Sequence, residues 1–153
     1  MAPADPPSDA PSPPGSGLHI RVFPARMTAL AGLSAFIEEV SGLAGMPRPA
    51  GLRLALLLEE LFTNTVVHGH RGDSDEPGRL VLGVEPGRIA LTYEDTGPPH
   101  DPFTEVTRPD DAATVEDRPV GGLGVLLVAA LATDVSYSRS GSQNQIRLVI
   151  RHP

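Results

Sequence analysis

Apolar residues recur every three or four positions in two long stretches of the chain, which is the spacing of one face of an amphipathic helix. The first stretch runs from Met27 to about Leu43. The second begins near Pro47 and continues to about Gly69. Proline is favoured at the start of a helix and glycine just past its end. The pattern therefore predicts two helices in the first half of the chain.

Short runs of alternating apolar and polar residues predict five strands around these helices. The second and third of them are separated by the turn-forming pair Pro86-Gly87, so we expect them to pair as a hairpin. The last two are joined at Ser140-Gly141-Ser142. The predicted strands are 19–23, 80–84, 88–93, 134–139 and 145–151. The expected fold class is α+β, a two-layer sandwich with a mostly antiparallel mixed sheet and its helices packed on one face.

The remaining segments lack this periodicity. Residues 1–17 consist mainly of Pro, Ala, Ser, Gly and Asp, and we expect a disordered tail there. Residues 18–153 are then expected to form a single domain, since they are enough for one well-buried core. The polar, proline-interrupted stretch 104–120 predicts a mobile loop, and a short helix is predicted to follow it over 123–132.

Composition narrows the possible functions. The chain has no cysteine, which excludes a disulfide framework and a thiolate metal site. Its net charge of −7 argues against sequence-independent nucleic-acid binding. It has no apolar run near the roughly 18 residues of a membrane helix and no secretory signal, so a cytoplasmic location is expected. All 12 basic side chains are arginine. Without lysine a P-loop is excluded, and any bound phosphate would need a metal, arginines or backbone N–H groups.

The second predicted helix carries an acid, an amide and an imidazole at four-residue steps, in Glu60, Asn64 and His68. Four-residue spacing places them along one flank of the helix. An amide oxygen can ligate a hard cation such as Mg²⁺, and a carboxylate one turn earlier can accept a proton from a hydroxyl or water nucleophile. Alternatively, Glu60 and Asn64 are solvated and His68 caps the helix end.

Two further motifs follow in the chain. Asp95-Thr96-Gly97 stands directly after a predicted strand, where a buried aspartate can accept a hydrogen bond from an exocyclic amine such as that of adenine. The alternative is an ordinary Asp-x-Gly turn. The glycines at 121, 122 and 124 open the predicted short helix, and exposed N–H groups at the positive end of a helix dipole bind phosphate. The alternative is a flexible loop leading into a helix.

In this order the motifs resemble those of the GHKL ATP-binding superfamily, which includes gyrase, a heat-shock chaperone, histidine kinases and MutL. The resemblance covers about residues 18–152. Glu60-x-x-x-Asn64-x-x-x-His68-Gly69 resembles its N box, Asp95-Thr96-Gly97 its first glycine box and Gly121-Gly122-Leu123-Gly124 its second. More narrowly, the His-Gly ending of the first motif, the Gly-Gly-x-Gly-Val second glycine box and the Gly-Pro-Pro-His-Asp-Pro run at 97–102 resemble the anti-sigma-factor serine/threonine kinase branch.

The resemblance implies a role for each matched residue. Asn64 would hold Mg²⁺ against the phosphates of ATP, and Glu60 would be the general base. Asp95 would bind the adenine amine, and Gly97 would line the base pocket. His68 matches a motif position at which the side chain would either contact the ligand or pack the helix end. The glycines that would wrap the phosphates are Gly121, Gly122 and Gly124.

The chain also departs from the family pattern. The segment between the two glycine boxes has no lysine, which leaves Mg²⁺ and the candidates Arg108 and Arg118 to balance the γ-phosphate charge. The last strand offers Gln143, Asn144 and Gln145 where relatives often place a threonine near the adenine, so this contact is unassigned.

The branch resemblance implies an ATP-binding serine protein kinase that phosphorylates a STAS-domain anti-anti-sigma protein and sequesters a sigma factor. It also implies a homodimer through the first strand and first helix. Two alternatives stay open: a partner-switching module that binds ATP without transferring phosphate, and a degenerate fold that binds partners without nucleotide. No direct contact with nucleic acid or membrane is expected.

Overall fold

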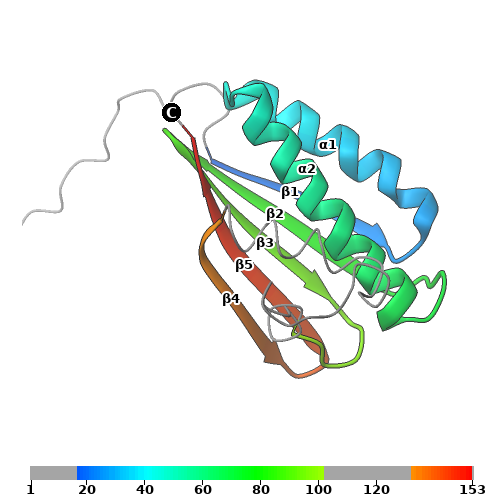
Figure 1. Ribbon diagram of the computed structural model, residues 1–153. Coiled ribbons are helices and arrows are strands. Elements are labelled where there is room, and N and C mark those ends of the chain that lie inside the picture. Colours follow the sequence, from blue (N-terminus) through cyan, green and yellow to red (C-terminus); the bar gives the residue numbers. More distant parts are fainter. Residues whose placement is uncertain (1–16, 102–131, 153) are drawn as a thin grey trace, which may run out of the picture.

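Two helices lie side by side on one face of a five-stranded sheet, which makes a two-layer α+β fold (Figure 1). The computed structural model describes residues 17–101 and 132–152. The elements in chain order are β1 (Gly17–Pro24), η1 (Met27–Ala29), α1 (Leu30–Leu43), α2 (Arg48–Thr63), η2 (Asn64–Gly69), β2 (Pro77–Glu85), β3 (Arg88–Asp95), β4 (Thr133–Ser140) and β5 (Gln143–Arg151). The predicted fold class is confirmed, and every strand pair in the described part of the chain is antiparallel.

The strand order is β1-β2-β3-β5-β4, so the last strand in the sequence lies inside the sheet rather than at its edge. The 88–93 and 145–151 segments, far apart in the chain, are therefore direct neighbours. Their register pairs Asp95 at the end of β3 with Asn144 near the start of β5. This pairing brings the first glycine box next to the last strand.

Alternation along the strands buries one face of the sheet against the helices. The core residues from the strands include Leu80, Leu82, Val84, Ile89, Leu91, Ile146, Leu148 and Ile150. They meet α1 residues Leu33, Phe36, Ile37 and Val40 and α2 residues Leu54, Leu57, Leu58 and Leu61. Each fully buried side chain of this size contributes about 1.5–3 kcal/mol relative to exposure. The sheet therefore provides a rigid base for the loops at its ends.

An aromatic group anchors the first strand to this core. The ring of Phe23 lies 5.5 Å from that of Phe62 in an edge-to-face arrangement and 5.9 Å from that of Tyr93. Gly78 on β2 makes room for it, since a Cβ at this position would lie 2.3 Å from Cε2 of Phe23.

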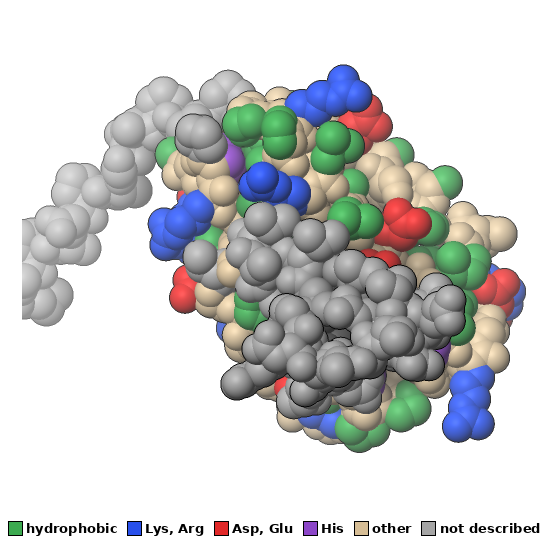
Figure 2. Space-filling model, viewed as in Figure 1, with side chains coloured by type: hydrophobic (Ala, Val, Ile, Leu, Met, Phe, Trp, Pro, Cys, Tyr) green, Lys and Arg blue, Asp and Glu red, His purple; other side chains and the backbone are tan. Residues whose placement is uncertain are grey.

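The outer surface of the helical layer, in contrast with its buried face, mixes apolar and charged side chains (Figure 2).

The element boundaries differ from the predicted ones in several places. The predicted disordered tail 1–17 overlaps β1, because Gly17 already pairs with Val84. The second strand begins at Pro77 instead of residue 80, since it pairs with β1 as far as Pro24. The first helical stretch opens with a 3₁₀ turn, η1, before the α-helix starts at Leu30. Residues 1–16, the predicted loop 104–120 and residues 123–131 of the predicted short helix lie outside the described residues.

The second predicted helix changes its winding near its end. It is α-helical to Thr63 and π-helical over Asn64–Gly69. The His70 N–H donates to the Thr65 carbonyl at 2.9 Å, which is the i→i+5 spacing of this wider winding. The Thr65 hydroxyl bonds to the carbonyl of Leu61, and such local bonding often distorts a helix. Short π segments of this kind are frequent at functional sites.

No helix in residues 17–101 and 132–152 is long and apolar enough to cross a membrane.

Candidate functional site

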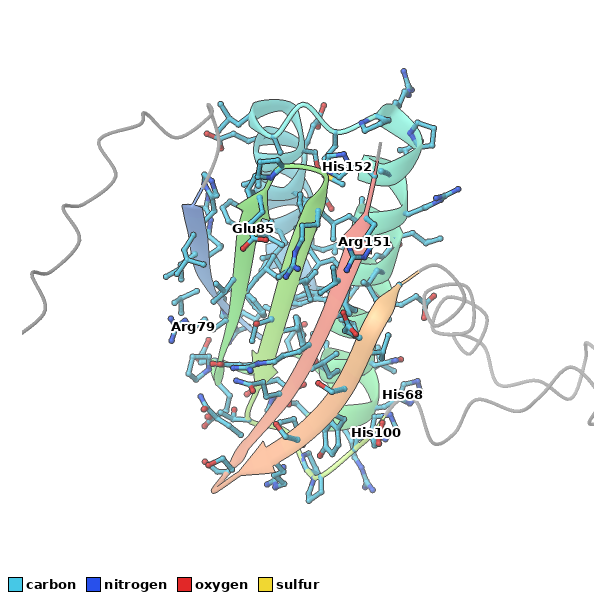
Figure 3. All side chains as sticks on the ribbon, turned by 90° about the vertical axis from the view of Figure 1, so that its left-hand side faces the viewer. His68, Arg79, Glu85, His100, Arg151 and His152 are labelled. Atoms are coloured by element: carbon cyan, nitrogen blue, oxygen red, sulfur yellow. The ribbon has the colours of Figure 1, made fainter. Side chains whose placement is uncertain are left out.

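A cavity of about 150 Å³ lies where η2 meets the ends of β3 and β5. The polar side chains among its lining residues are those of Asn64, Thr65, His68, Tyr93, Asp95, His100 and Asn144. Figure 3 shows His68 and His100 at this end of the sheet, with Glu85, Arg151 and His152 at the opposite end. The structure thus gathers residues from two of the three predicted motifs, and from the last strand, around one cavity.

Asp95 stands at the end of β3 with both carboxylate oxygens engaged. Oδ1 accepts from the Gly97 N–H at 3.0 Å and from Nδ2 of Asn144 at 2.8 Å, and Oδ2 accepts from the Thr65 hydroxyl at 2.9 Å. The first of these bonds closes an Asx turn. Gly97 is buried, and a Cβ there would lie 3.6 Å from the Cα of Gly69. The loop after β3 is therefore held tightly against the end of η2.

A buried hydroxyl pair links Asp95 to the core. Tyr93 and Thr65 are hydrogen-bonded between their hydroxyls at 2.6 Å. Burial of the Tyr93 ring raises the pKa of its phenol far above the usual value, the hydrogen bond with Thr65 lowers it, and the Asp95 charge raises it further. The phenol is therefore neutral at all ordinary pH values and can donate to Thr65. The Thr65 proton then favours the Asp95 carboxylate, since hydrogen bonds to charged groups are stronger than neutral ones.

Asn144 completes this cluster from β5, and its side chain is buried, with the residue 4% exposed. Its amide donates to Asp95 and to the carbonyls of Gly97 and Pro98. In the sequence Asn144 was only one of three candidates for an unassigned contact. Neither its spacing nor its neighbours distinguish it, because its importance arises from the insertion of β5 beside β3. The sequence does not identify Thr65 and Tyr93 either, because the bond between them joins segments 28 residues apart in the chain.

The three residues of the N-box motif do not all reach the cavity. Asn64 and His68 line it. Glu60 lies one turn earlier and is not among the lining residues. Desolvation by burial, and secondarily the charge of Glu59, raises the pKa of Glu60. A raised pKa makes a carboxylate a better proton acceptor near neutral pH.

The phosphate-binding glycines predicted at 121, 122 and 124 lie outside the described residues, as do Arg108 and Arg118. Within the described ranges, no group of three or more His, Asp or Glu side chains is arranged to hold a metal ion. Among its lining residues, the cavity offers a carboxylate acceptor in Asp95 and a neutral amide in Asn64. An amide oxygen fits a cation that takes most of its other ligands from water and phosphate.

The profile of the family described as histidine kinase-like ATPase domain matches residues 23–150. No curated protein matches the chain.

Among solved structures, the crystal structure of the RsbU and RsbW domains of Rv1364c from Mycobacterium tuberculosis is similar with a TM-score of 0.63 and 14% identity. The match covers 90% of this chain and 32% of that one, so the chain spans about a third of its length. The histidine kinase domain from the Erythrobacter litoralis EL346 blue-light activated histidine kinase gives a TM-score of 0.46 and 21% identity, with coverage of 85% and 62%.

Proposed function

Since the chain belongs to the histidine kinase-like ATPase domain family, which implies ATP binding, we propose that the cavity between η2 and the ends of β3 and β5 receives the adenine of ATP. The observation that carries this proposal is the state of Asp95. Its carboxylate is held at the cavity by Thr65 and Asn144, and Oδ2 has a single protein partner among the described residues. An acceptor of this kind suits the exocyclic amine of adenine. Gly97 would let the base approach the backbone closely.

The phosphates would lie on the Asn64 side of the cavity. The Asn64 amide oxygen is a suitable ligand for Mg²⁺, which would neutralise phosphate charge. The backbone N–H groups at Gly121, Gly122 and Gly124 would receive the phosphate oxygens, as at other glycine-rich helix starts. Glu60 lies one helical turn before Asn64 and would act on a group bound beside it.

The proposed reaction is transfer of the γ-phosphoryl group of ATP to a serine of another protein. The serine oxygen would form a bond to the γ-phosphorus while the bond from phosphorus to the ADP oxygen breaks. The serine proton would pass to the Glu60 carboxylate, whose raised pKa suits a proton acceptor. Transfer of this kind depends mainly on positioning and electrostatic stabilisation.

The partner proteins are proposed from the motif resemblance. The His68-Gly69 ending of the N box and the Gly-Pro-Pro-His-Asp-Pro run at 97–102 resemble anti-sigma-factor serine kinases. The fold is also shared with a chain that contains an RsbW domain. The protein substrate would then be a STAS-domain anti-anti-sigma protein, and the unphosphorylated substrate would displace a sequestered sigma factor.

A labelled-phosphate assay tests this proposal. The full chain is incubated with γ-labelled ATP, Mg²⁺ and the cognate STAS protein, and label on the STAS protein is measured. We expect Glu60→Gln to bind ATP without transferring label, and Asn64→Ala to lose Mg²⁺-dependent ATP binding. A complex that forms without any labelling would replace the kinase with the non-catalytic partner-switching module. Undiminished transfer by Glu60→Gln would remove Glu60 as the base.

We also propose a homodimer through β1, which is an edge strand. Its alternate residues Leu18, Ile20 and Val22 point away from the helical layer and are 72%, 50% and 62% exposed. An edge strand with an apolar outer face is prone to pair with another strand. Light scattering after size exclusion should give a dimer mass that Ile20→Lys reduces to a monomer. A monomeric wild-type chain at high micromolar concentration would contradict the proposal.

A further inference from the structure

We propose that Asn144 is a positioning residue that determines which nucleobase the cavity accepts, because it holds the Asp95 carboxylate in one orientation. The inference rests on the proposed ATP site. It concerns the selection of the base and not the binding of phosphates or the transfer step. The sequence offers residues 143, 144 and 145 for the contact from the last strand near the adenine and does not choose among them. The inference assigns this contact to Asn144.

The amide nitrogen of Asn144 faces three acceptors. Nδ2 lies 2.8 Å from Oδ1 of Asp95, 2.9 Å from the Pro98 carbonyl and 3.1 Å from the Gly97 carbonyl. The nitrogen carries two protons, so its bonds are shared among these three oxygens. The amide therefore joins the carboxylate to the backbone of the loop that follows it.

The amide oxygen of Asn144 faces two donors from β4. The Tyr137 hydroxyl donates to Oδ1 at 2.5 Å and Nη1 of Arg139 donates to it at 3.0 Å. Reversing the amide would place its oxygen against three acceptors and its nitrogen against two donors, so only one orientation is chemically possible. Arg139 and Tyr137 also bind the same loop directly, at the Gly97 carbonyl and the His100 N–H. The β4–β5 hairpin thus fastens the loop at several points.

This arrangement makes the two oxygens of Asp95 unequal. Oδ1 is occupied by the N–H of Gly97 and the amide of Asn144, whereas Oδ2 accepts only from Thr65 among the described residues. A carboxylate oxygen accepts about two hydrogen bonds. Oδ2 therefore retains the capacity to accept one donor from a ligand. Without Asn144, Oδ1 would keep only the Gly97 N–H as a partner, and the carboxylate would be held less firmly with Oδ2 towards the base.

The structure offers a matched control one residue away. Gln145 donates from Nε2 to Oε1 of Glu94 at 2.9 Å. Both pairs join β5 to β3 in consecutive register positions, Asp95 with Asn144 and Glu94 with Gln145. The two amide–carboxylate bonds are therefore alike in chemistry, but they project from opposite faces of the sheet. Loss of the Gln145 bond should affect stability alone.

The test compares ATP with purine riboside triphosphate, which is ATP without the 6-amino group. Dissociation constants are measured by calorimetry for the wild type, Asn144→Leu and Gln145→Met, in which each amide is replaced by an apolar side chain of similar shape. We expect the wild type to prefer ATP by about tenfold or more, since an acceptor left without its donor is costly. The preference should fall towards one in Asn144→Leu and stay at the wild-type value in Gln145→Met. Asn144→Thr, which keeps one hydroxyl donor, should retain most of it.

Each other outcome counts against the inference in a distinct way. A wild-type preference that persists in Asn144→Leu, or in Asn144→Ala should the leucine variant not fold, would make Asn144 merely structural. An equal loss in Gln145→Met would attribute the effect to general loosening of the sheet. Equal binding of the two nucleotides by the wild type would show that Asp95 does not recognise the amine. A wild type that binds neither nucleotide would overturn the proposed ATP site itself, and the inference with it.

Discussion

Replacing Thr65 by valine should unbalance the buried hydrogen bonds behind the cavity while keeping the shape of the side chain. In the wild type the Tyr93 hydroxyl lies 2.6 Å from the Thr65 hydroxyl, its only partner among the described residues. The substitution leaves the Tyr93 hydroxyl without an acceptor in the core. It also removes the 2.9 Å bond to Oδ2 of Asp95. A buried unsatisfied polar group costs about 1–3 kcal/mol, and a lost bond to a charged group costs about 1.5–3 kcal/mol. Since Asp95 keeps its other partners, we expect the free energy of unfolding to fall by about 2–4 kcal/mol.

The double variant Thr65→Val/Tyr93→Phe separates this explanation from a simple loss of contacts. Phenylalanine removes the stranded hydroxyl, so the double variant should be about 1–2 kcal/mol more stable than Thr65→Val alone. Urea unfolding followed by far-UV circular dichroism measures both values, because the chain has no tryptophan to report on. A double variant less stable than Thr65→Val would refute the reasoning, since the two changes would then simply add.

Three further predictions concern other parts of the fold. Burial raises the pKa of Glu60 above its usual 4.5, so the charged form of this side chain is disfavoured in the folded state. The contribution of the neutral side chain to the free energy of unfolding is therefore present at low pH and is lost as the pH rises through the folded pKa. Glu60→Gln should therefore be more stable than the wild type in urea at pH 7, and the difference should close below about pH 4. Gly78→Ala would force a Cβ to 2.3 Å from the Phe23 ring and should lower stability by about 1–3 kcal/mol, whereas Gly83→Ala, whose nearest neighbour is at 3.4 Å, should change thermal unfolding little. Asp75→Asn removes the exposed 2.7 Å ion pair between Asp75 and Arg26, which lies in the β1–η1 connection. Any change in melting temperature should be small and should vanish in high salt.

The periodicity of the chain is enough to predict most of its secondary structure. In residues 17–101 and 132–152, two helices and five strands appear close to where the pattern places them, because each element buries one face and the burial period differs between helix and strand. The family prediction is confirmed by the profile match over residues 23–150. The motifs could be recognised because the chemistry of a site requires particular residue types at short local spacings.

Local spacing could not predict the winding of the second helix near its end. Its last turn is π-helical, where the apolar pattern predicts a regular helix to Gly69. The Thr65 hydroxyl, which lies within hydrogen-bond distance of both the Leu61 carbonyl and the Asp95 carboxylate, lies at this change of winding. The second of these partners is 30 residues away in the chain, so no local pattern contains it.

The sequence by itself determined the fold class, the element types and the motif that contains Asp95. Only the tertiary structure decided which side chains surround that carboxylate. Strand β5 enters between β3 and β4, and this placement brings Asn144 to within 2.8 Å of Asp95 across 49 residues of chain. The physical reason is that strand order depends on how all the strands pack together in the sheet, whereas periodicity reports only which face of each strand is buried.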